Sequence, residues 1–428
     1  MSTDVPPSGS GRRKFLRGML GAGATAAVTG AAVTGYAARA AQAARGGPST
    51  AVQAADPGAT LPAVPFHGPH QAGILPVPQR QVLVCSCDVT ASDRGELTDA
   101  LRALTDRAAF LTAGGTPPPA GRTGPPADSG ILGPTVVPDG LTVTVGLGAS
   151  LFDDRYGLAK RKPAQLTTMR TFPDDDLEPA QCGGDLSLVL AAGSSDTLLH
   201  ALRDITRYTE GAMQVRWQIS GFSNAPRPSG TPRNLMGFKD GIANPDASDA
   251  TAMNHLVWVP PGDTDEPAWT AGGSYQVIRL IRMFVEFWDR VSITEQERMF
   301  GRRRDNGAPL DANGEFDTPD YASDRPGAII PLDSHIRLAN PRTAQTAGSR
   351  ILRRSYNYDR GTDNVGGQNM GLIFSCYQRN PRLQFETVQD RLIGEPLTDY
   401  ISPFGGGYFF ALPGAKNVSD YLGRALLA

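Results

Sequence analysis

Residues 185–222 read DLSLVLAAGSSDTLLHALRDITRYTEGAMQVRWQISGF, and the fold can be worked out from this stretch. The nearly continuous apolar run at 185–192 predicts a buried strand. Segment 195–209 repeats leucine and isoleucine at helical spacing between charged residues, which predicts an amphipathic helix. In 213–222 apolar and polar side chains alternate, as is typical of a half-buried strand. The stretch therefore predicts the last three elements of a β-α-β-β-α-β unit.

Outward from this stretch, the same order of elements occurs twice. The first half, 81–224, adds strands at 81–89 and 140–149 and a helix at 94–112. For the second half, 225–428, the patterns predict strands at 274–283, 350–358, 371–378 and 407–412 and helices at 284–300 and 382–393. Each half has the ferredoxin-like order, so the predicted fold class is α+β, with the two halves packed as one α+β barrel.

The first residues of the chain have the layout of a signal sequence for secretion. Residues 1–43 contain the pair Arg12 and Arg13, a charge-free stretch at 18–38 and small residues suited to cleavage, which together predict a twin-arginine signal peptide. The alternative is a transmembrane anchor, but alanine, glycine and threonine partition only weakly into hydrocarbon. Residues 44–80 are predicted to be a linker and N-terminal arm. We expect export to the periplasm, the cell envelope or the medium.

The composition indicates which partners, metal sites and loops to expect. The 41 basic and 43 acidic residues are scattered along the chain, which argues against a nucleic-acid partner. Cys85 and Cys87 lie on one face of a predicted strand without a second zinc-spaced pair, so we expect buried thiols. Segments 113–134 and 301–330 are rich in glycine, proline or charged residues. Segment 113–134 is predicted to be a disordered loop, and segment 301–330 is predicted to be a less extreme loop of the same kind.

The chain has five histidines, His67, His70, His200, His255 and His335. His200 falls inside the amphipathic helix and His255 precedes an apolar run, so both are interpreted as structural. Glycine and proline between His67 and His70 prevent a helical metal pair. His335 stands ahead of a predicted strand with several arginines, a neighbourhood suited to a haem ligand with cations for the propionates.

The run Gly237-Phe238-Lys239-Asp240-Gly241 is the other dense stretch, and taken alone it predicts a turn. It also resembles the G-x-x-D-G motif of dye-decolourising (DyP-type) haem peroxidases. Further segments resemble that family in order and spacing: His70-Gln71-Ala72-Gly73-Ile74, Cys182-Gly183-Gly184-Asp185-Leu186, Asn340-Pro341-Arg342, Ile351-Leu352-Arg353-Arg354-Ser355-Tyr356 and Gly405-Gly406-Gly407-Tyr408-Phe409-Phe410. The resemblance runs from about residue 66 onward and favours the exported bacterial branch that includes the iron-uptake-linked deferrochelatase/peroxidase.

This resemblance implies one haem b per chain, with His335 as the proximal iron ligand, Asp240 as the distal acid–base residue and Arg353 as the distal arginine. It also implies haem contacts from Gly241, Ile242, Ala243, Asn340, Pro341, Arg342 and Arg353. Some relatives have an asparagine where this chain has Ser355. For the carboxylate that orients the imidazole, we prefer Asp399 over Asp390.

The implied activity is reduction of hydrogen peroxide and oxidation of dyes or other one-electron donors through a ferryl haem. The alternative is a haem-handling deferrochelatase or a haem-binding protein of iron uptake, which shares the fold and site. A chlorite-decomposing enzyme is a third hypothesis, although it needs no glycine–aspartate motif. An iron-uptake or redox partner and a homo-oligomer are compatible with the sequence.

Overall fold

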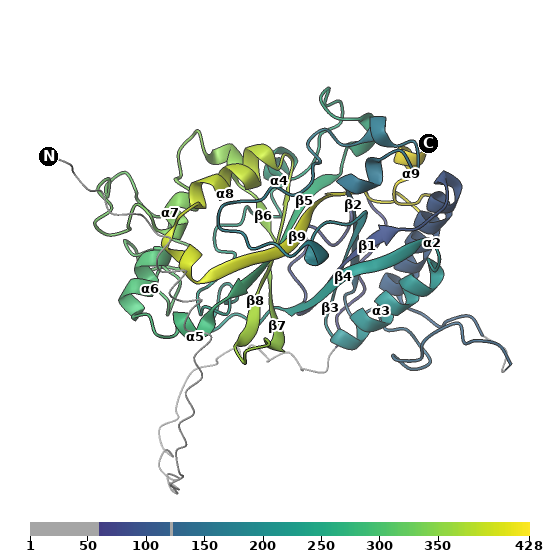
Figure 1. Ribbon diagram of the computed structural model, residues 1–428, viewed down its shortest axis with the longest axis horizontal. Helices are drawn as coiled ribbons and strands as arrows, with labels where there is room; N and C mark the ends of the chain where they lie inside the picture. Colours follow the sequence, from purple (N-terminus) through teal and green to yellow (C-terminus); the bar gives the residue numbers. More distant parts are fainter. Residues whose placement is uncertain (1–59, 120–122) are drawn as a thin grey trace, which may run out of the picture. The chain divides into compact units, whose positions relative to one another are not determined.

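Alternating strands and helices follow the expected order in a computed structural model, which describes residues 60–119 and 123–428 (Figure 1). The predicted signal peptide, 1–43, and residues 44–59 of the predicted linker and arm lie outside the described residues. Within the described ranges, no helix combines the length and apolar character that crossing a membrane requires.

The first half is a ferredoxin-like sheet covered by two helices. Its elements are β1 Gln81–Val89, α2 Arg94–Ala113, β2 Thr142–Gly148, β3 Leu186–Ala192, α3 Ser195–Tyr208 and β4 Met213–Phe222. The strands pair antiparallel in the order β2-β3-β1-β4. Helix α2 begins after Asp93, whose side chain accepts from the backbone N–H of Glu96. Both helices pack on one face of this sheet, beside each other (Figure 1).

The second half repeats this arrangement with more irregular connections. Its elements are α4 Ala250–Leu256, β5 Ser274–Met283, α5 Val285–Trp288, α6 Ile293–Phe300, α7 His335–Ala339, β6 Leu352–Arg353, β7 Tyr356–Thr362, β8 Gln368–Gln378, a π-helical turn Arg382–Glu386, α8 Thr387–Leu392, β9 Ile401–Ala411 and α9 Arg424–Leu427. The main strands pair in the order β9-β5-β8-β7, with β6 on β8. Four strands thus take the same spatial order in both halves.

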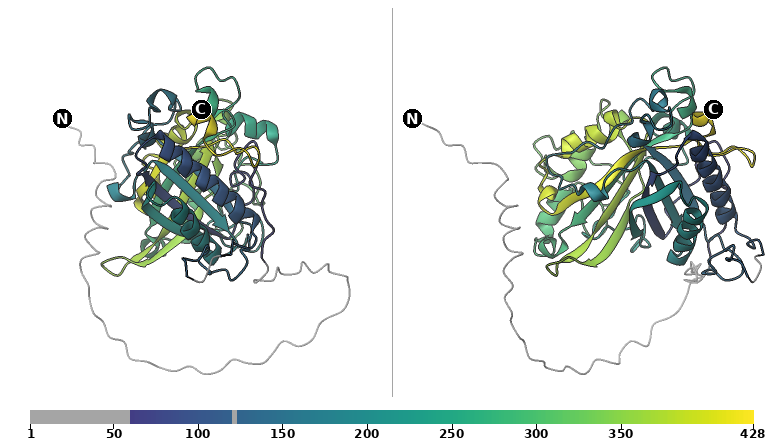
Figure 2. Two further views of the ribbon diagram at one scale, coloured as in Figure 1. Left: turned by 90° about the vertical axis from the view of Figure 1, so that its right-hand side faces the viewer. Right: turned by 45° about the vertical axis from the view of Figure 1, so that its right-hand side comes forward.

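The two halves join edge to edge and close a barrel (Figure 2). Gly146 of β2 pairs with Ala411 of β9, and Phe222 of β4 pairs with Asn357 of β7. Both halves contribute side chains to one buried cluster, which includes Val84 and Ile278. The predicted α+β barrel of two ferredoxin-like halves is therefore confirmed.

Three local predictions differ from the structure. Segment 284–300 forms two short helices, because Ser292 caps a new helix at Ile293. The strand expected at 350–358 is interrupted between β6 and β7, where Arg354 still donates its N–H to Ser375 O at 2.8 Å. Beyond Ala113, the last residue of α2, the described part of 113–134 forms no helix or strand. Asp128 nevertheless lies 2.6 Å from Nε2 of buried His200, so this part is tied to α3 and disorder is the wrong description of it.

The cysteines agree with the sequence interpretation. All four are free, and Cys85 and Cys87 are buried with their Sγ atoms 3.6 Å apart. Burial raises the pKa of the Cys376 thiol, so this cysteine also behaves as an apolar side chain in the core.

Candidate functional site

A cavity of about 270 Å³ opens on the outer side of the second half's sheet. Strand β5 directs Ile278 and Leu280 into the barrel, while Arg279 and Ile281 line the cavity. The predicted site residues that line it are Asp240, Gly241, Ile242, Ala243, His335, Asn340, Arg342 and Arg353. Pro341 is the one predicted haem contact that does not line it. The fold therefore brings nearly the whole predicted set to one place.

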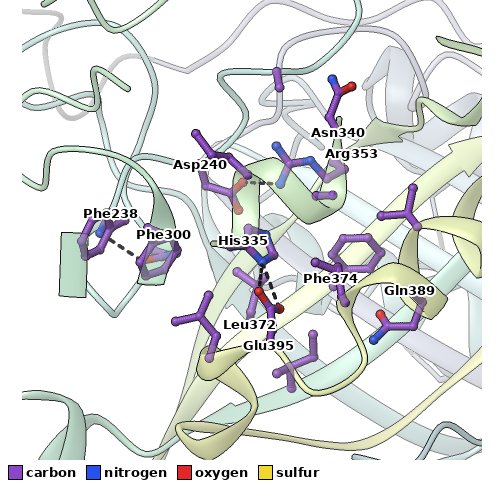
Figure 3. A pocket seen from close by; sticks show the side chains of 18 of the residues that line it. Phe238, Asp240, Phe300, His335, Asn340, Arg353, Leu372, Phe374, Gln389 and Glu395 are labelled. Atoms are coloured by element: carbon purple, nitrogen blue, oxygen red, sulfur yellow. Dashed lines mark hydrogen bonds and ion pairs between the residues drawn. The ribbon is translucent and has the colours of Figure 1, made fainter. Parts of the chain in front are cut away.

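His335 is the first residue of α7, and its ring faces Glu395 (Figure 3). Its Nδ1 lies 3.0 and 2.9 Å from the two carboxylate oxygens of Glu395, which is buried. Burial lowers the pKa of His335, but attraction and the hydrogen bond from Glu395 outweigh burial and raise it overall. The contact favours a proton on Nδ1 and leaves Nε2 as the nitrogen that can bind a metal.

The preference for Asp399 over Asp390 as the orienting carboxylate is wrong. Asp390 forms an ion pair with Arg170 at 2.8 Å, and both side chains are exposed. Asp399 is the last residue of the 3₁₀ turn Pro396–Asp399, and Glu395 precedes that turn. A glutamate directly before a proline gives no sequence pattern of its own, because only the fold brings it to a histidine 60 positions away.

Helix α7 is too short to hold His335 by itself and depends on its neighbours. The guanidinium of Arg391, on α8, donates to the carbonyls of Leu338 at 3.0 Å and Ala339 at 2.9 Å. These bonds satisfy carbonyls that a helix C-terminus leaves without intrahelical partners. The ring of Phe300 packs against the imidazole, with 6.0 Å between ring centroids.

Asp240 and Arg353 face each other across from His335 (Figure 3). The guanidinium of Arg353 donates through Nη1 to Oδ1 of Asp240 at 2.8 Å, and both side chains are partly buried. The loop before Asp240 turns at Gly237 and the loop after it turns at Gly241, with φ of 86° and 95°. Residues with a side chain avoid this backbone region, so these glycines fix the direction of the Asp240 carboxylate.

Asn244 positions the other partner of this pair, and the sequence analysis missed it. Its side-chain Nδ2 donates to Arg353 O at 2.9 Å, and its Oδ1 accepts from Arg353 N at 3.1 Å. The Asn244 amide thus makes the two backbone hydrogen bonds with Arg353 that a neighbouring strand would otherwise make. The Asn244-Pro245 dipeptide predicted a turn and gave no hint of this long-range contact.

A buried ion pair anchors the loop that carries Asp240. Lys239 Nζ lies 2.6 Å from Oε2 of Glu315, and both side chains are largely buried. Oε1 of Glu315 accepts from the N–H and hydroxyl of Thr231, each at 2.8 Å. Burial raises the pKa of Glu315, but the hydrogen bonds from Lys239 and Thr231 lower it overall. Segment 301–330, which contains Glu315, is therefore part of the site's support.

The residues around the cavity suit a haem. Nε2 of His335 is a neutral-imidazole ligand of the kind that haem iron accepts. Apolar side chains from the sheet, Leu372 and Phe374, line the cavity and suit the porphyrin, and the exposed Arg342 and Arg350 suit its propionates. The other four histidines, His67, His70, His200 and His255, do not line this cavity. His70 instead stacks on Trp258 with 3.8 Å between ring centroids.

We expect Glu315→Gln to lower the free energy of unfolding at neutral pH by about 3 kcal/mol, because it leaves buried Lys239 without its charge partner. The pKa of Glu315 is lowered in the folded protein, so this stabilisation is present above the ordinary glutamate pKa of about 4.3 and is lost as the pH falls. Wild type and variant should therefore converge in acid. Denaturant unfolding from neutral to acidic pH measures this.

The control is Asp88→Asn, which makes the same chemical change in the exposed Asp88–Arg216 pair. It should change stability by less than about 1 kcal/mol. Equal losses in the two variants would contradict an anchoring role for the Lys239–Glu315 pair.

Comparison with known proteins agrees with this geometry. Residues 71–223 match the Dyp-type peroxidase N-terminal family model, and residues 231–416 match the C-terminal one. The chain is 53% identical over 369 residues to the deferrochelatase of Escherichia coli strain K12, covering 85% of this chain and 87% of that relative. 

Solved structures give the same result. The DyP-type peroxidase from Cellulomonas bogoriensis is 36% identical with a TM-score of 0.77, covering 87% of this chain and 99% of that one. Ferric DtpA from Streptomyces lividans is 34% identical with a TM-score of 0.76, covering 86% and 97%. The resemblance noted in the sequence is confirmed: the chain belongs to the Dyp-type peroxidase family of haem-dependent oxidoreductases that act on peroxide.

Proposed function

We propose that this chain reduces hydrogen peroxide at a haem b held by Nε2 of His335, with Asp240 as the proton-transfer residue and Arg353 as its partner. One observation carries the proposal. A carboxylate-bound imidazole and an arginine–aspartate pair face the same cavity, lined in between by apolar side chains. A peroxidase needs these two different environments on opposite sides of one cofactor.

Bound haem supplies the iron at which the oxygen–oxygen bond of peroxide is broken and the oxidising equivalents are kept. Glu395 holds Nδ1 of His335 and keeps its Nε2 available. Asp240 takes a proton from one oxygen of hydrogen peroxide and gives it to the other, which leaves as water. The positively charged guanidinium of Arg353 stabilises negative charge on the carboxylate and on the leaving oxygen. Gly241, Ile242, Ala243, Asn340 and Arg342 would line the haem.

The proposed donors are small molecules or dyes that give up one electron at a time. A bulky donor would need a redox-active side chain at the surface to relay its electrons. The four tryptophans, Trp217, Trp258, Trp269 and Trp288, are all buried. None of them can touch such a donor at the surface. Their burial supports the simpler interpretation that they pack the core.

A second candidate function is removal of iron from haem with the porphyrin left intact. The supporting observation is the 53% identity to proteins named deferrochelatase. This function would use the same cavity and the same His335 ligand. An iron-uptake partner belongs to this second candidate.

His335→Ala should abolish stable haem binding, because it removes the only histidine among the described residues that line the cavity. Glu395→Gln keeps the shape of the side chain but removes the negative charge that faces Nδ1 of His335. It should weaken haem binding by about 10–100-fold. Haem titration followed by the Soret absorbance measures both. His255→Ala, at an exposed histidine of α4, is the control and should bind haem like wild type. Normal haem binding by His335→Ala without added imidazole would overturn the ligand assignment.

The two candidate functions give different products. Wild type should oxidise a one-electron dye with hydrogen peroxide, and Asp240→Ala should slow this about 10²–10⁴-fold. Asp359→Ala, at an exposed aspartate of β7, should stay at the wild-type rate. In parallel, porphyrin fluorescence after incubation with ferric haem reports iron release. Metal-free protoporphyrin without peroxide turnover would favour the deferrochelatase instead.

We also propose export by the twin-arginine route, supported by Arg12 and Arg13 ahead of the charge-free stretch 18–38. Changing both arginines to lysine should trap the precursor inside the cell, because lysine keeps the charge but lacks the planar guanidinium. Fractionation with an antibody against the chain measures this. The single Arg45→Lys change, in the linker, is the control. Undiminished export of the double variant would point to another route.

A further inference from the structure

A second, much smaller cavity lies behind Asp240. Its volume is about 20 Å³, and it shares Asn234, Asp240 and Leu372 with the main cavity. Asp240 therefore stands between the two spaces. The rest of the small cavity's lining comes from the seam between the halves: Phe222, Ser223, Pro232, Arg233, Ser355, Tyr356 and Asn357.

Three residues that line this cavity have a buried polar atom without a hydrogen-bond partner among the described residues: Oγ of Ser355, the hydroxyl of Tyr356 and Oδ1 of Asn357. The Tyr356 side chain alternates to the other side of the strand, beside Arg354, which leaves Oγ of Ser355 and Oδ1 of Asn357 at the cavity. Asn357 is only 4% exposed, and its Nδ2 donates to Arg233 O at 3.0 Å. That bond orients the amide and leaves Oδ1 as an acceptor. Because leaving such groups unpaired is unfavourable, two of them at one small cavity indicate a polar occupant.

The chain geometry explains why these atoms gather beside Asp240. Successive side chains of an extended segment alternate between two sides, so Arg353, Ser355 and Asn357 project to the same side. Asn357 pairs with Leu372 across the sheet and with Phe222 across the seam. Arg353 itself donates to Asp240. One segment thus supplies the cation of the distal pair and both orphan atoms.

We propose that this cavity binds one water molecule, held by Ser355 and Asn357 and hydrogen-bonded to the Asp240 carboxylate. A volume of about 20 Å³ is enough for one water but leaves no room for a larger ligand. The water donates one hydrogen to Asn357 Oδ1 and one to Asp240, and accepts the hydroxyl hydrogen of Ser355. Three partners is the usual number for a buried water.

This water delivers protons to Asp240 from the side opposite the main cavity; this role rests on the proposed peroxidase function. Reduction of one hydrogen peroxide to two waters consumes two electrons and two protons. The donors supply the electrons, and each proton has to reach an oxygen beside Asp240. The bound water gives a proton to the carboxylate and takes one from the Ser355 hydroxyl, which takes a proton from solvent water in the same concerted transfer. Ser223 and Pro232, at the same cavity, are partly exposed and mark the side that faces solvent. Ser355 and Asn357 are positioning residues in this scheme.

The first test is a high-resolution crystal structure of the haem-loaded enzyme. It should show a water within hydrogen-bonding distance of Ser355 Oγ, Asn357 Oδ1 and Asp240. Ser355→Ala should lose this water or leave it poorly ordered, and Ser355→Thr, which keeps a hydroxyl, should retain it. A dry cavity in the wild-type crystal would overturn the proposal, and would do so whether or not the enzyme is a peroxidase.

The second test separates proton delivery from a structural role. Ser355→Ala should lower kcat for donor oxidation about tenfold with the KM for peroxide unchanged. It should also raise the solvent isotope effect on kcat in D₂O, because proton delivery then limits turnover. Ser355→Thr should restore both values. Ser195→Ala makes the same change at the exposed start of α3 and should match wild type.

Unchanged kcat and isotope effect in folded Ser355→Ala would overturn the delivery role even if the water is present. Should Ser355→Ala fail to fold, Asn357→Asp provides the second variant, since it keeps an acceptor oxygen at Oδ1 and adds charge beside Asp240. A wild-type isotope effect in that variant would likewise overturn the role. Absence of peroxide turnover in the wild type would refute the proposed function and leave the crystallographic test of the water intact.

Discussion

The candidate site depends on the contact between one imidazole and one buried carboxylate. Glu395 lies 3.0 and 2.9 Å from Nδ1 of His335, which leaves Nε2 as the nitrogen that a metal could bind. The helix that carries His335 has five residues and little stability of its own. Arg391 and the ring of Phe300 hold it from outside. The wall of the cavity that carries His335 is therefore held by tertiary contacts, and Arg391 links α8 to the helix that carries the imidazole.

The opposite wall depends on how the two halves meet. The barrel closes where β4 meets β7 and β2 meets β9, and the segment that carries Arg353 leads directly into β7. Asn244 fixes the backbone of Arg353 by two hydrogen bonds, and Arg353 in turn fixes Asp240. Asp240 is thus held by Arg353, whose backbone is held by Asn244, and the segment that carries Arg353 continues into a strand that closes the barrel.

Periodicity predicted the fold well because strand and helix patterns are local properties of the chain. Alternation in 213–222 and helical spacing in 195–209 correspond to β4 and α3 almost residue for residue. The family resemblance likewise named His335, Asp240 and Arg353, which the structure brings to one cavity. Glu395 and Asn244 were missed because their partners lie 60 and 109 positions away. No local pattern records a contact that exists only after the sheet has formed.

Irregular backbone around the cavity is stabilised largely by arginine side chains. Arg302 donates to the carbonyls of Gly307 at 2.6 Å and Glu315 at 3.0 Å, and Arg337 donates to those of Asp324 at 2.7 Å and Ile330 at 2.8 Å. Each loop carbonyl that lacks a strand or helix partner needs such a donor. A guanidinium offers five donors in a fixed plane, so one side chain can serve two carbonyls where lysine could not keep the same geometry. In the sequence these arginines look like ordinary surface charge, Arg302 within 301–330 and Arg337 just after it. Arg302 is buried and Arg337 is partly buried, so their hydrogen bonds tie loops without secondary structure to the structure around the cavity.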